Sequence, residues 1–274
     1  MTAPSARGRV TGSLLFVRDW LLENLLAVST WLAGAASLEA VVGLGARVGR
    51  AWVRLNGPRV ARVRQQLAQA FPEAAPMTLD TWTTDVFANL GRGLAELILL
   101  RGRHHNALLG RVEVGGLEHL EAAERGSAAG GVLVVTAHYG NWELAGVKIA
   151  SLGIPLSAIY RGLSVPVLDR ALSSIRSGVE RAPLDYEQIR MGNAGPAVVR
   201  ALEAGRKVLV LLDQNARRKE GVFVSFFGRP ASVRRGPVRF ATEHGIPVLA
   251  AFIGRDANGL DHRIQIHPPL ELER

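Results

Sequence analysis

The hydrophobic pattern divides the chain into a helical first part and a second part in which strands and helices alternate. Short, continuously apolar runs are typical of strands that are buried on both faces. They lie at 131–136, 156–160, 207–212, 222–227 and 247–253, and helical segments separate them at 142–151, 165–179, 196–204 and 236–244. This alternation predicts an α/β fold with helices flanking a mostly parallel central sheet.

The first part contains a strongly apolar stretch from Trp20 to Ala46. Residues 24–38 carry no charge, but Glu23 and Glu39 interrupt the run. A spanning helix needs about 20 largely apolar residues, so the stretch is borderline for a membrane crossing. It is too long and too interrupted for a cleaved signal peptide. The pattern favours a membrane-associated helix, inserted or interfacial, and the alternative is a helix buried in the protein.

These patterns predict one α/β domain with an N-terminal extension. We expect a flexible tail over residues 1–19, a membrane-associated helix over 20–46, a helical segment over 47–110 and an α/β core over 111–274. Phe71-Pro72 breaks the helical segment. The sequence GLGARVG at 43–49 superficially resembles a nucleotide-binding loop, but no βαβ unit surrounds it and no acid lies about 20 residues on. Its small residues instead predict close helix packing.

Charge adds a question about partners. The 274 residues carry a net charge of +9. Six arginines and no acid lie at 47–64, and seven cations with one acid lie at 217–239. Such clusters suit nucleic acid, an anionic membrane or an anionic substrate. The apolar stretch before residues 47–64 favours a cytoplasmic membrane surface, and no nucleic-acid recognition motif is present. The absence of cysteine excludes disulfides, thiolate metal sites and a cysteine nucleophile.

Candidate chemistry follows the strand predicted at 131–136. His138 lies at the carboxyl end of that strand, where open α/β sheets form their sites. Gly140 permits a turn, Asn141 is a good helix N-cap, and Glu143 then falls in the first helical turn. After such a turn, the Glu143 carboxylate can point back at the His138 imidazole. A carboxylate on one ring nitrogen fixes the tautomer, and this arrangement is typical of a general base.

The segment HYGNWE at 138–143 resembles the His-x4-Asp/Glu signature of glycerolipid-type acyltransferases. Its surroundings are similar to those in the bacterial lipid A biosynthesis acyltransferases, the lauroyl and myristoyl transferases. The resemblance covers the chain from about Trp20 onward. Its other motifs are QQLAQAFPE at 65–73, Phe87 to Gly91 to Glu96, IYR at 159–161, LLDQN at 211–215 and GVFVSFFGRPA at 221–231, followed by Gly236-Pro237.

The resemblance implies transfer of a fatty acyl chain from acyl carrier protein or coenzyme A to a hydroxyl of an anionic glycolipid, a lipid A precursor. In that reaction His138 is the base, Glu143 orients it and Arg161 is the candidate oxyanion donor; a surface or ion-paired role is the alternative for Arg161. The resemblance further implies an enzyme of the bacterial inner membrane, facing the cytoplasm, without a metal or redox cofactor. The residues assigned to substrate binding are Asn141, Asp213, Gln214, Arg234 and Arg235.

Several alternatives stay open. Phosphatidylinositol mannoside acyltransferases share the architecture, although Glu143, where that branch is associated with Asp, favours lipid A. Acylation of a lysophospholipid or amino lipid is a further enzymatic alternative, and a non-catalytic membrane lipid-binding protein is one of another class. The sequence departs from the family pattern at Ser232–Arg235, where two arginines replace small or hydroxyl residues. The family has a further C-terminal helical segment that would follow Arg274, so either the sequence is a truncated form or the segment is absent. A missing segment would weaken membrane docking or activity.

Overall fold

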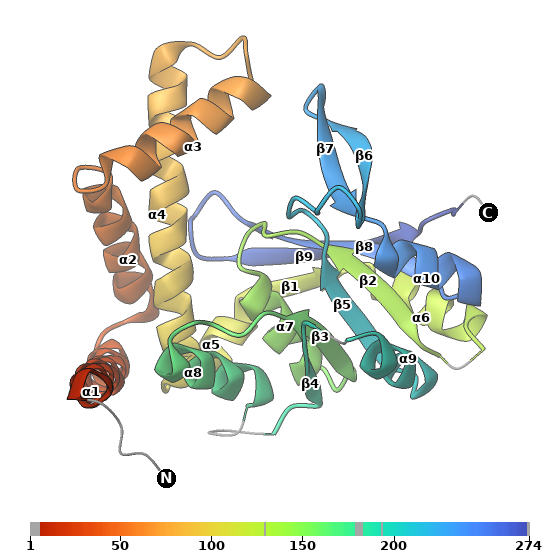
Figure 1. The fold of residues 1–274 in the computed structure, drawn as a ribbon, viewed down its shortest axis with the longest axis horizontal. Coiled ribbons are helices and arrows are strands. Elements are labelled where there is room, and N and C mark those ends of the chain that lie inside the picture. Colours follow the sequence, from red (N-terminus) through yellow and green to blue (C-terminus); the bar gives the residue numbers. More distant parts are fainter. Residues whose placement is uncertain (1–5, 129, 179–182, 193, 273–274) are drawn as a thin grey trace.

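The computed structural model describes residues 6–128, 130–178, 183–192 and 194–272 (Figure 1). The described helices are α1 (Ala6–Ala35), α2 (Leu38–Trp52), α3 (Gly57–Ala70), α4 (Pro76–Arg101), α5 (His105–Gly110), α6 (Leu117–Gly126), α7 (Trp142–Ser151), α8 (Pro166–Ser177), α9 (Gly195–Glu203) and α10 (Gly236–His244). The described strands are β1 (Val112–Gly115), β2 (Val132–Thr136), β3 (Leu156–Tyr160), β4 (Tyr186–Arg190), β5 (Lys207–Leu211), β6 (Gly221–Phe226), β7 (Arg229–Arg234), β8 (Val248–Arg255) and β9 (His262–Pro269).

A seven-stranded sheet forms the centre of the molecule. Its strands lie in the order β1-β9-β8-β2-β5-β3-β4, and all neighbours run parallel except the antiparallel pair β8 and β9. The predicted fold class, a mostly parallel sheet flanked by helices, is therefore confirmed. Because β2, β5 and β3 are parallel neighbours, their carboxyl ends meet at one edge, and this edge carries the candidate site.

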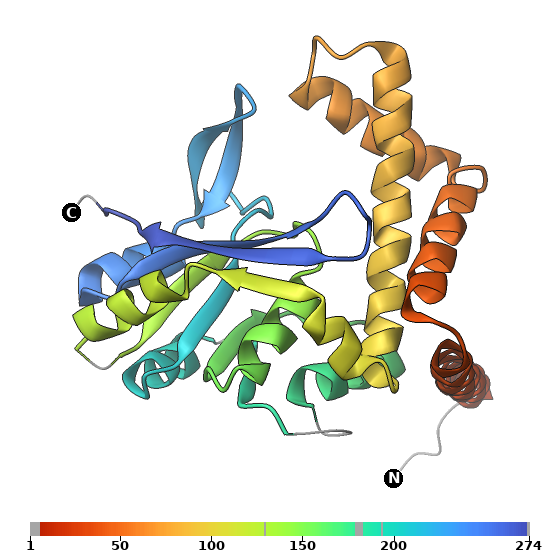
Figure 2. The same ribbon diagram turned by 180° about the vertical axis from the view of Figure 1, so that it is seen from behind.

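The two faces of the sheet are covered by different helices (Figures 1 and 2). Val132 and Val134 of β2 pack with residues of α6 and α7, whereas Leu133 between them packs with residues of α9 and α10. Successive side chains of a strand point to opposite faces, so a strand covered on both sides is apolar at every position. This is the physical reason for the continuous run at 131–136.

The apolar run at 222–227 is the exception to this rule. It forms β6, which pairs only with β7 in a two-stranded antiparallel hairpin outside the central sheet. Its side chains from Val222 to Phe226 are exposed. The prediction that this run belongs to the buried parallel sheet is wrong, because apolar content does not say which surface will cover a strand. The prediction also missed β1, β4 and β9, which are short or alternate apolar with polar residues.

The N-terminal helices differ from the predicted boundaries. α1 already begins at Ala6, so residues 6–19 are helical where a flexible tail was expected, and residues 1–5 lie outside the described part. The segment contains no proline and leads without interruption into the apolar stretch. The single helix predicted over 20–46 is divided at Ser37, whose hydroxyl accepts a hydrogen bond from the N–H of Ala40 at 3.2 Å and begins α2.

Apolar side chains of α1 are largely exposed, which argues against the alternative of a helix buried in the protein. The exposed ones include Trp20, Leu21, Leu25, Val28, Trp31 and Leu32. Within the described residues, no helix combines the length and the apolar character needed to cross a membrane. Large exposed apolar patches mark interaction surfaces, so the exposed side of α1 is a candidate for one.

Glycines hold α2 against α4, as the small residues at 43–49 predict. A Cβ added at Gly45 would collide with the carbonyl oxygen of Gly91, and one at Gly49 with that of Phe87. The two helix backbones therefore touch at these positions, and larger residues would force them apart. α4 begins at Pro76 after α3 ends at Ala70, which agrees with the predicted break at Phe71-Pro72.

Candidate active site

β2 delivers His138 to the carboxyl-terminal edge of the sheet. The strand ends at Thr136, and a turn over residues 137–141 leads into α7. Gly140 in this turn has a φ of +61°, and a Cβ on it would collide with the carbonyl oxygen of Ile253. Glycine meets both demands because it tolerates positive φ and lets two backbones approach closely. The predicted turn after His138 is confirmed.

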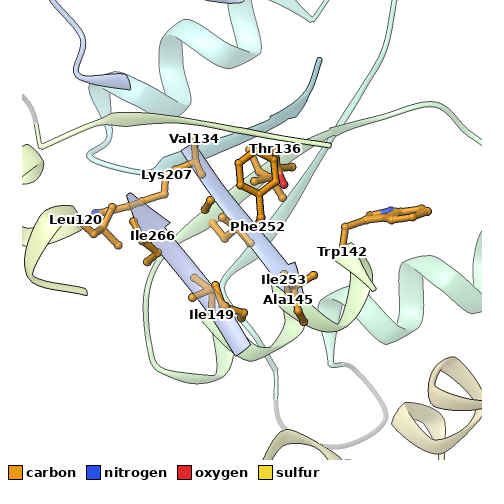
Figure 3. Close-up of a pocket in the computed structure, with 15 residues that line it drawn as sticks. Leu120, Val134, Thr136, Trp142, Ala145, Ile149, Lys207, Phe252, Ile253 and Ile266 are labelled. Atoms are coloured by element: carbon orange, nitrogen blue, oxygen red, sulfur yellow. The ribbon is translucent and has the colours of Figure 1, made fainter. Parts of the chain in front are cut away.

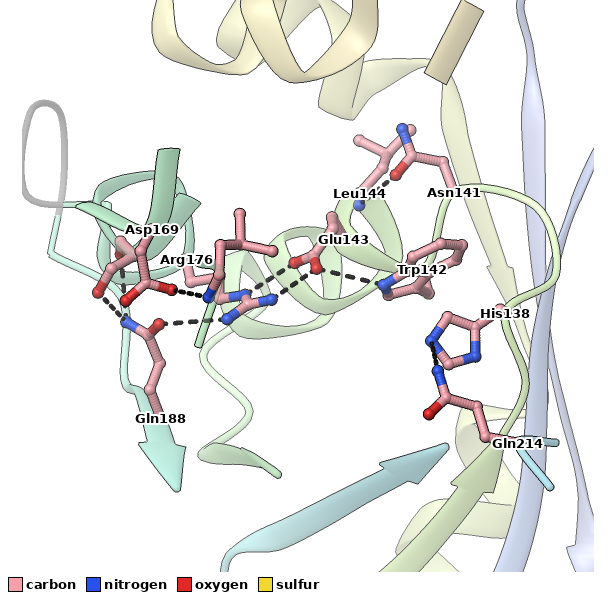
Figure 4. A network of polar contacts seen from close by, with 11 residues as sticks. His138, Asn141, Trp142, Glu143, Leu144, Asp169, Arg176, Gln188 and Gln214 are labelled. Carbon is pink, nitrogen blue, oxygen red and sulfur yellow. Dashed lines mark hydrogen bonds and ion pairs between the residues drawn. The ribbon is translucent and has the colours of Figure 1, made fainter. Parts of the chain in front are cut away.

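Asp213, which follows β5, binds His138 through both carboxylate oxygens. Oδ1 lies 2.8 Å from the imidazole Nδ1, and Oδ2 accepts the backbone N–H of His138 at 2.8 Å. A carboxylate on Nδ1 keeps the proton there, so Nε2 presents its lone pair. The side-chain nitrogen of Gln214 lies 3.3 Å from that Nε2 (Figure 4). The His138 and Asp213 side chains are 34% and 32% exposed, so the pair is open to an incoming molecule.

Glu143 does not orient His138 as predicted. Its carboxylate is held by Arg176 of α8, whose Nε donates to Oε2 at 2.8 Å and whose NH2 donates to Oε1 at 2.6 Å (Figure 4). Trp142 donates its indole N–H to Oε1 at 3.2 Å. Both carboxylate oxygens are thus used within the protein, and the orienting carboxylate comes from Asp213 instead.

The Glu143–Arg176 pair is buried, which explains why it is bidentate. Both side chains are 9% exposed, and a buried charge needs a partner with good hydrogen-bond geometry. Burial lowers the pKa of Arg176, but the hydrogen bonds and charge of Glu143 outweigh this effect, so the pKa is raised overall. The pair ties the first turn of α7 to α8. Glu143 lies in that first turn, as predicted.

Trp142 lies between the buried pair and His138. Its ring is in edge contact with the His138 ring, with centroids 4.8 Å apart and an interplanar angle of 73°. The indole N–H is fixed by Glu143, so the ion pair sets the position of the ring that packs on the imidazole. Glu143 therefore acts on His138 through Trp142 packing and through the position of α7, without a direct hydrogen bond.

Asn141 is an internal structural residue, which corrects its assignment to substrate binding. It is 7% exposed. Its Oδ1 accepts the N–H of Leu144 at 3.2 Å and caps α7, and its Nδ2 donates to Oε2 of Glu96 at 2.8 Å. Both ends of the amide bind within the protein, and burial keeps the side chain away from a ligand. The N-cap role predicted for Asn141 is confirmed.

Glu96 of α4 is the centre of a buried polar network that sequence reasoning missed. It is fully buried, and it pairs with Arg255 of β8, whose NH2 donates to Oε2 at 2.9 Å. His262 of β9 places Nε2 3.4 Å from Oε1 of Glu96, and burial lowers its pKa although Glu96 opposes the shift. Through Asn141 this network connects the helical arm, formed by α2, α3 and α4 (residues 38–101), to the turn that carries His138. Neither this network nor any other group of three or more described His, Asp or Glu side chains is arranged to hold a metal ion.

Arg161 follows β3 at the same edge of the sheet as His138. β3 neighbours β5, and β5 neighbours β2, so Arg161 is two strands away from the strand that carries His138. Its side chain is exposed. Among the described residues it has no hydrogen-bond or ion-pair partner. Its proposed contact with an oxyanion stays a prediction.

Arg234 and Arg235 lie where the β6–β7 hairpin joins α10. Arg234 is at the end of β7 and pairs with Glu220 at 3.1 Å, and Arg235 is the exposed residue before α10. The hairpin projects from the same side of the sheet as α3, as Figure 1 shows. Phe227 at the turn of the hairpin contacts Phe71, which follows α3, with ring centroids 5.4 Å apart. The role of both arginines in substrate binding stays a prediction.

A narrow apolar cavity begins beside this site. Its volume is about 50 Å³, and Thr136 and Trp142 line it near the strand end (Figure 3). The cavity continues between the sheet and the helices α6 and α7, where its lining includes Val134, Ala145, Ile149 and Leu209. An activated histidine next to a narrow apolar cavity suits chemistry on a group attached to a hydrocarbon chain.

Comparison with known proteins agrees with this geometry. A family profile described as bacterial lipid A biosynthesis acyltransferase matches residues 11–274. The chain belongs to this family. The acyltransferase is similar to phosphatidylinositol mannoside acyltransferase of Mycobacterium tuberculosis (strain ATCC 25618 / H37Rv), with 27% identity over 256 residues, 88% of this chain and 75% of the relative. The protein of that name from Mycolicibacterium smegmatis is 26% identical over 240 residues, 86% of this chain and 74% of the relative.

The acyltransferase therefore moves an acyl group from a donor to a glycolipid acceptor. The structure brings together three of the predicted site residues, His138, Asp213 and Gln214. Glu143 does not contact the His138 ring, and Asn141 is not placed to bind substrate. Arg176 had no sequence signal, because its partner lies 33 residues away and neither residue forms a motif with the other. Asp213 did have a signal, since the LLDQN motif ends a strand at the same edge.

Proposed function

We propose that the acyltransferase transfers a fatty acyl chain from an acyl thioester, on acyl carrier protein or coenzyme A, to a hydroxyl of an anionic glycolipid. The observation that carries this proposal is the His138–Asp213 pair beside the apolar cavity. The cavity receives the hydrocarbon chain, which leaves the thioester carbonyl at its mouth next to the imidazole. No metal ion or redox cofactor takes part in this reaction.

The proton moves through one nitrogen of His138. The acceptor hydroxyl takes the place of the Gln214 amide at Nε2 and gives its proton to that nitrogen while its oxygen attacks the thioester carbonyl. The carbon–oxygen bond forms as the carbonyl becomes an oxyanion. Collapse of the oxyanion breaks the carbon–sulfur bond, and protonated His138 returns the proton to the departing thiolate. Asp213 stabilises the imidazolium that forms between these steps.

Arg161 is our candidate for stabilising the oxyanion. It extends from the edge of the sheet that carries His138, and its guanidinium has no competing partner among the residues that the structure describes. A preorganised donor at a developing oxyanion typically contributes a few kcal/mol. Replacing Arg161 by Gln lowers kcat about 10²-fold in this proposal, with little change in the binding of acyl donor.

The acceptor is a phosphorylated glycolipid. Clustered arginines at 217–239 include Arg234 and Arg235, and guanidinium groups bind phosphate by paired hydrogen bonds. Two acceptor classes fit. A lipid A precursor is favoured by the family profile, and a phosphatidylinositol mannoside is favoured by the named relatives. Both are glycolipids that carry a phosphate and free hydroxyl groups.

Purified full-length protein tests the proposal. It is incubated with acyl-coenzyme A or acyl carrier protein thioester and with each acceptor, and the products are identified by mass spectrometry. We expect one new ester on one acceptor class and no turnover by His138→Ala. If His138→Ala keeps wild-type turnover, the mechanism is wrong; if neither acceptor is acylated while a lysophospholipid is, the acceptor class is wrong. Lipids of a deletion strain give the same distinction in the cell.

A further inference from the structure

The cavity beside His138 runs along the strands to the opposite edge of the sheet. At one end it is lined by Thr136 and Trp142 and at the other by Leu120 and Lys207, as Figure 3 shows. Lys207 pairs in register with Val132, four residues before Thr136 on β2. At about 3.3 Å per strand residue, these two ends are about 13 Å apart. An extended alkyl chain of about ten carbons has this length. The cavity has a volume of only about 50 Å³, so its side walls must move apart to admit such a chain.

Lys207 is an unusual residue for the end of an apolar cavity. It is the first residue of β5 and is 7% exposed. Its Nζ lies 2.6 Å from Oε1 of Glu124 on α6 and donates to the carbonyl oxygen of Gly205 at 2.9 Å. Its apolar stem therefore lines the cavity while its ammonium is fixed between a helix and the strand start.

This ion pair makes a firmer end wall than an apolar side chain would. An apolar residue at this position can change its rotamer for one more methylene without losing a polar partner. Displacing Lys207 would separate its ammonium from the half-buried carboxylate of Glu124 and from the carbonyl of Gly205. The Lys207 side chain is only 8% exposed, and leaving a buried charge without a partner is unfavourable. The methyl end of a chain offers the ammonium no compensating partner.

We propose that the Lys207–Glu124 pair is the floor of the acyl cavity and sets the longest chain that the enzyme accepts. The proposal rests on the acyl transfer proposed above and adds its length specificity. Chains that reach Lys207 fill the cavity, and each methylene short of it forgoes burial that improves kcat/KM about fourfold. Chains that exceed the length are rejected.

A panel of saturated acyl-coenzyme A donors of increasing length tests the floor, with acyl transfer to the accepted glycolipid as the readout. The wild type shows kcat/KM rising to one length and falling sharply beyond it. Lys207→Ala removes the stem beyond Cβ, so the preferred length increases by at least two carbons. Leu120→Phe adds volume at the same end and shifts the preference to shorter chains.

Arg206→Ala is the matched control, because Arg206 adjoins Lys207 but binds Asp185 and Ser157. It keeps the wild-type profile. If Lys207→Ala and Leu120→Phe both keep the wild-type length preference, the Lys207–Glu124 pair is not the floor of the cavity. The proposed acyl transfer is unaffected by that result. Should Lys207→Ala fail to fold, Leu120→Phe decides alone. A wild type that transfers no chain of any length would instead overturn the proposed function.

Discussion

The carboxylate of Asp213 holds His138 at two points, the ring Nδ1 and the backbone N–H, each at 2.8 Å. Asp213, two residues after the end of β5, thereby fixes both the tautomer of the imidazole and the path of the turn that carries it. The two residues are 75 positions apart in the chain and meet because β2 and β5 are parallel neighbours. The following predictions test this relationship and the packing that supports it.

Replacing Asp213 by Asn will reduce acyl transfer while the fold persists. The amide can still contact the ring, but it no longer favours the tautomer with Nδ1 protonated, and it cannot stabilise the imidazolium. By analogy with other carboxylate–histidine pairs, kcat should fall by about 10³–10⁴-fold. Steady-state turnover of the purified protein measures this effect, with circular dichroism as the folding control. Near wild-type turnover by Asp213→Asn would show that Asp213 does not orient His138 for the reaction.

Replacing Glu143 by Ala will act chiefly on stability. The substitution leaves Arg176 buried without its partner, which costs about 3–5 kcal/mol in the free energy of unfolding. Urea denaturation measures this change. The matched variant combines Glu143→Leu with Arg176→Met and so removes both charges. Its destabilisation should be markedly smaller than the sum of those measured for Glu143→Leu and Arg176→Met separately. If the two destabilisations simply add, Glu143 and Arg176 do not stabilise one another.

Gly49→Ala will destabilise the helical arm, because its Cβ meets the carbonyl oxygen of Phe87 on α4. Overpacking of this kind costs about 1–3 kcal/mol. Gly43→Ala, in the same helix, has nothing within 4 Å of the added Cβ. It should raise stability by about 0.5–1 kcal/mol, because alanine favours a helix over glycine. Thermal denaturation of the two variants gives opposite signs if α2 and α4 touch as described.

The stability of the protein will fall with acid through His262. Burial lowers its pKa in the folded state below the usual 6.5, so the unfolded chain binds the proton first. The free energy of unfolding is therefore highest above about pH 6.5 and decreases as the pH falls from there toward the folded-state pKa. His262→Gln should flatten the decrease between pH 7 and pH 5. The exposed His267 provides the control, and His267→Gln should keep the wild-type slope.

Exposed aromatic residues of α1 will mediate membrane binding. We propose that this helix lies in the interface of the inner membrane on its cytoplasmic side, with the arginines at 47–64 near anionic lipid. Trp20→Glu combined with Trp31→Glu should abolish sedimentation of the protein with vesicles of phosphatidylethanolamine and phosphatidylglycerol. Leu270→Glu, at an exposed site near the other end of the chain, should sediment as the wild type does. Full sedimentation of the double variant would place the anchor elsewhere.

The sequence by itself determined the class of fold and the position of His138, the candidate base. Continuous apolar runs at 131–136 and 207–212 identified central strands, because a strand covered on both faces must be apolar at each position. His138 after such a strand and the turn at Gly140 fixed where the site would lie. These features depend on neighbours in the chain, and local patterns report them well.

Only the tertiary structure decided which carboxylate serves His138. Glu143 is close in sequence, but α8 brings Arg176 to it, and the buried pair satisfies both of its oxygens. Asp213 is distant in sequence, but the strand order places it beside the imidazole. Lys207 and Glu124 are likewise distant in sequence, and only the fold places them together at the end of the cavity. Strand order and helix packing decide such contacts, because they bring together residues that are far apart in the sequence. No local pattern in the sequence can predict them.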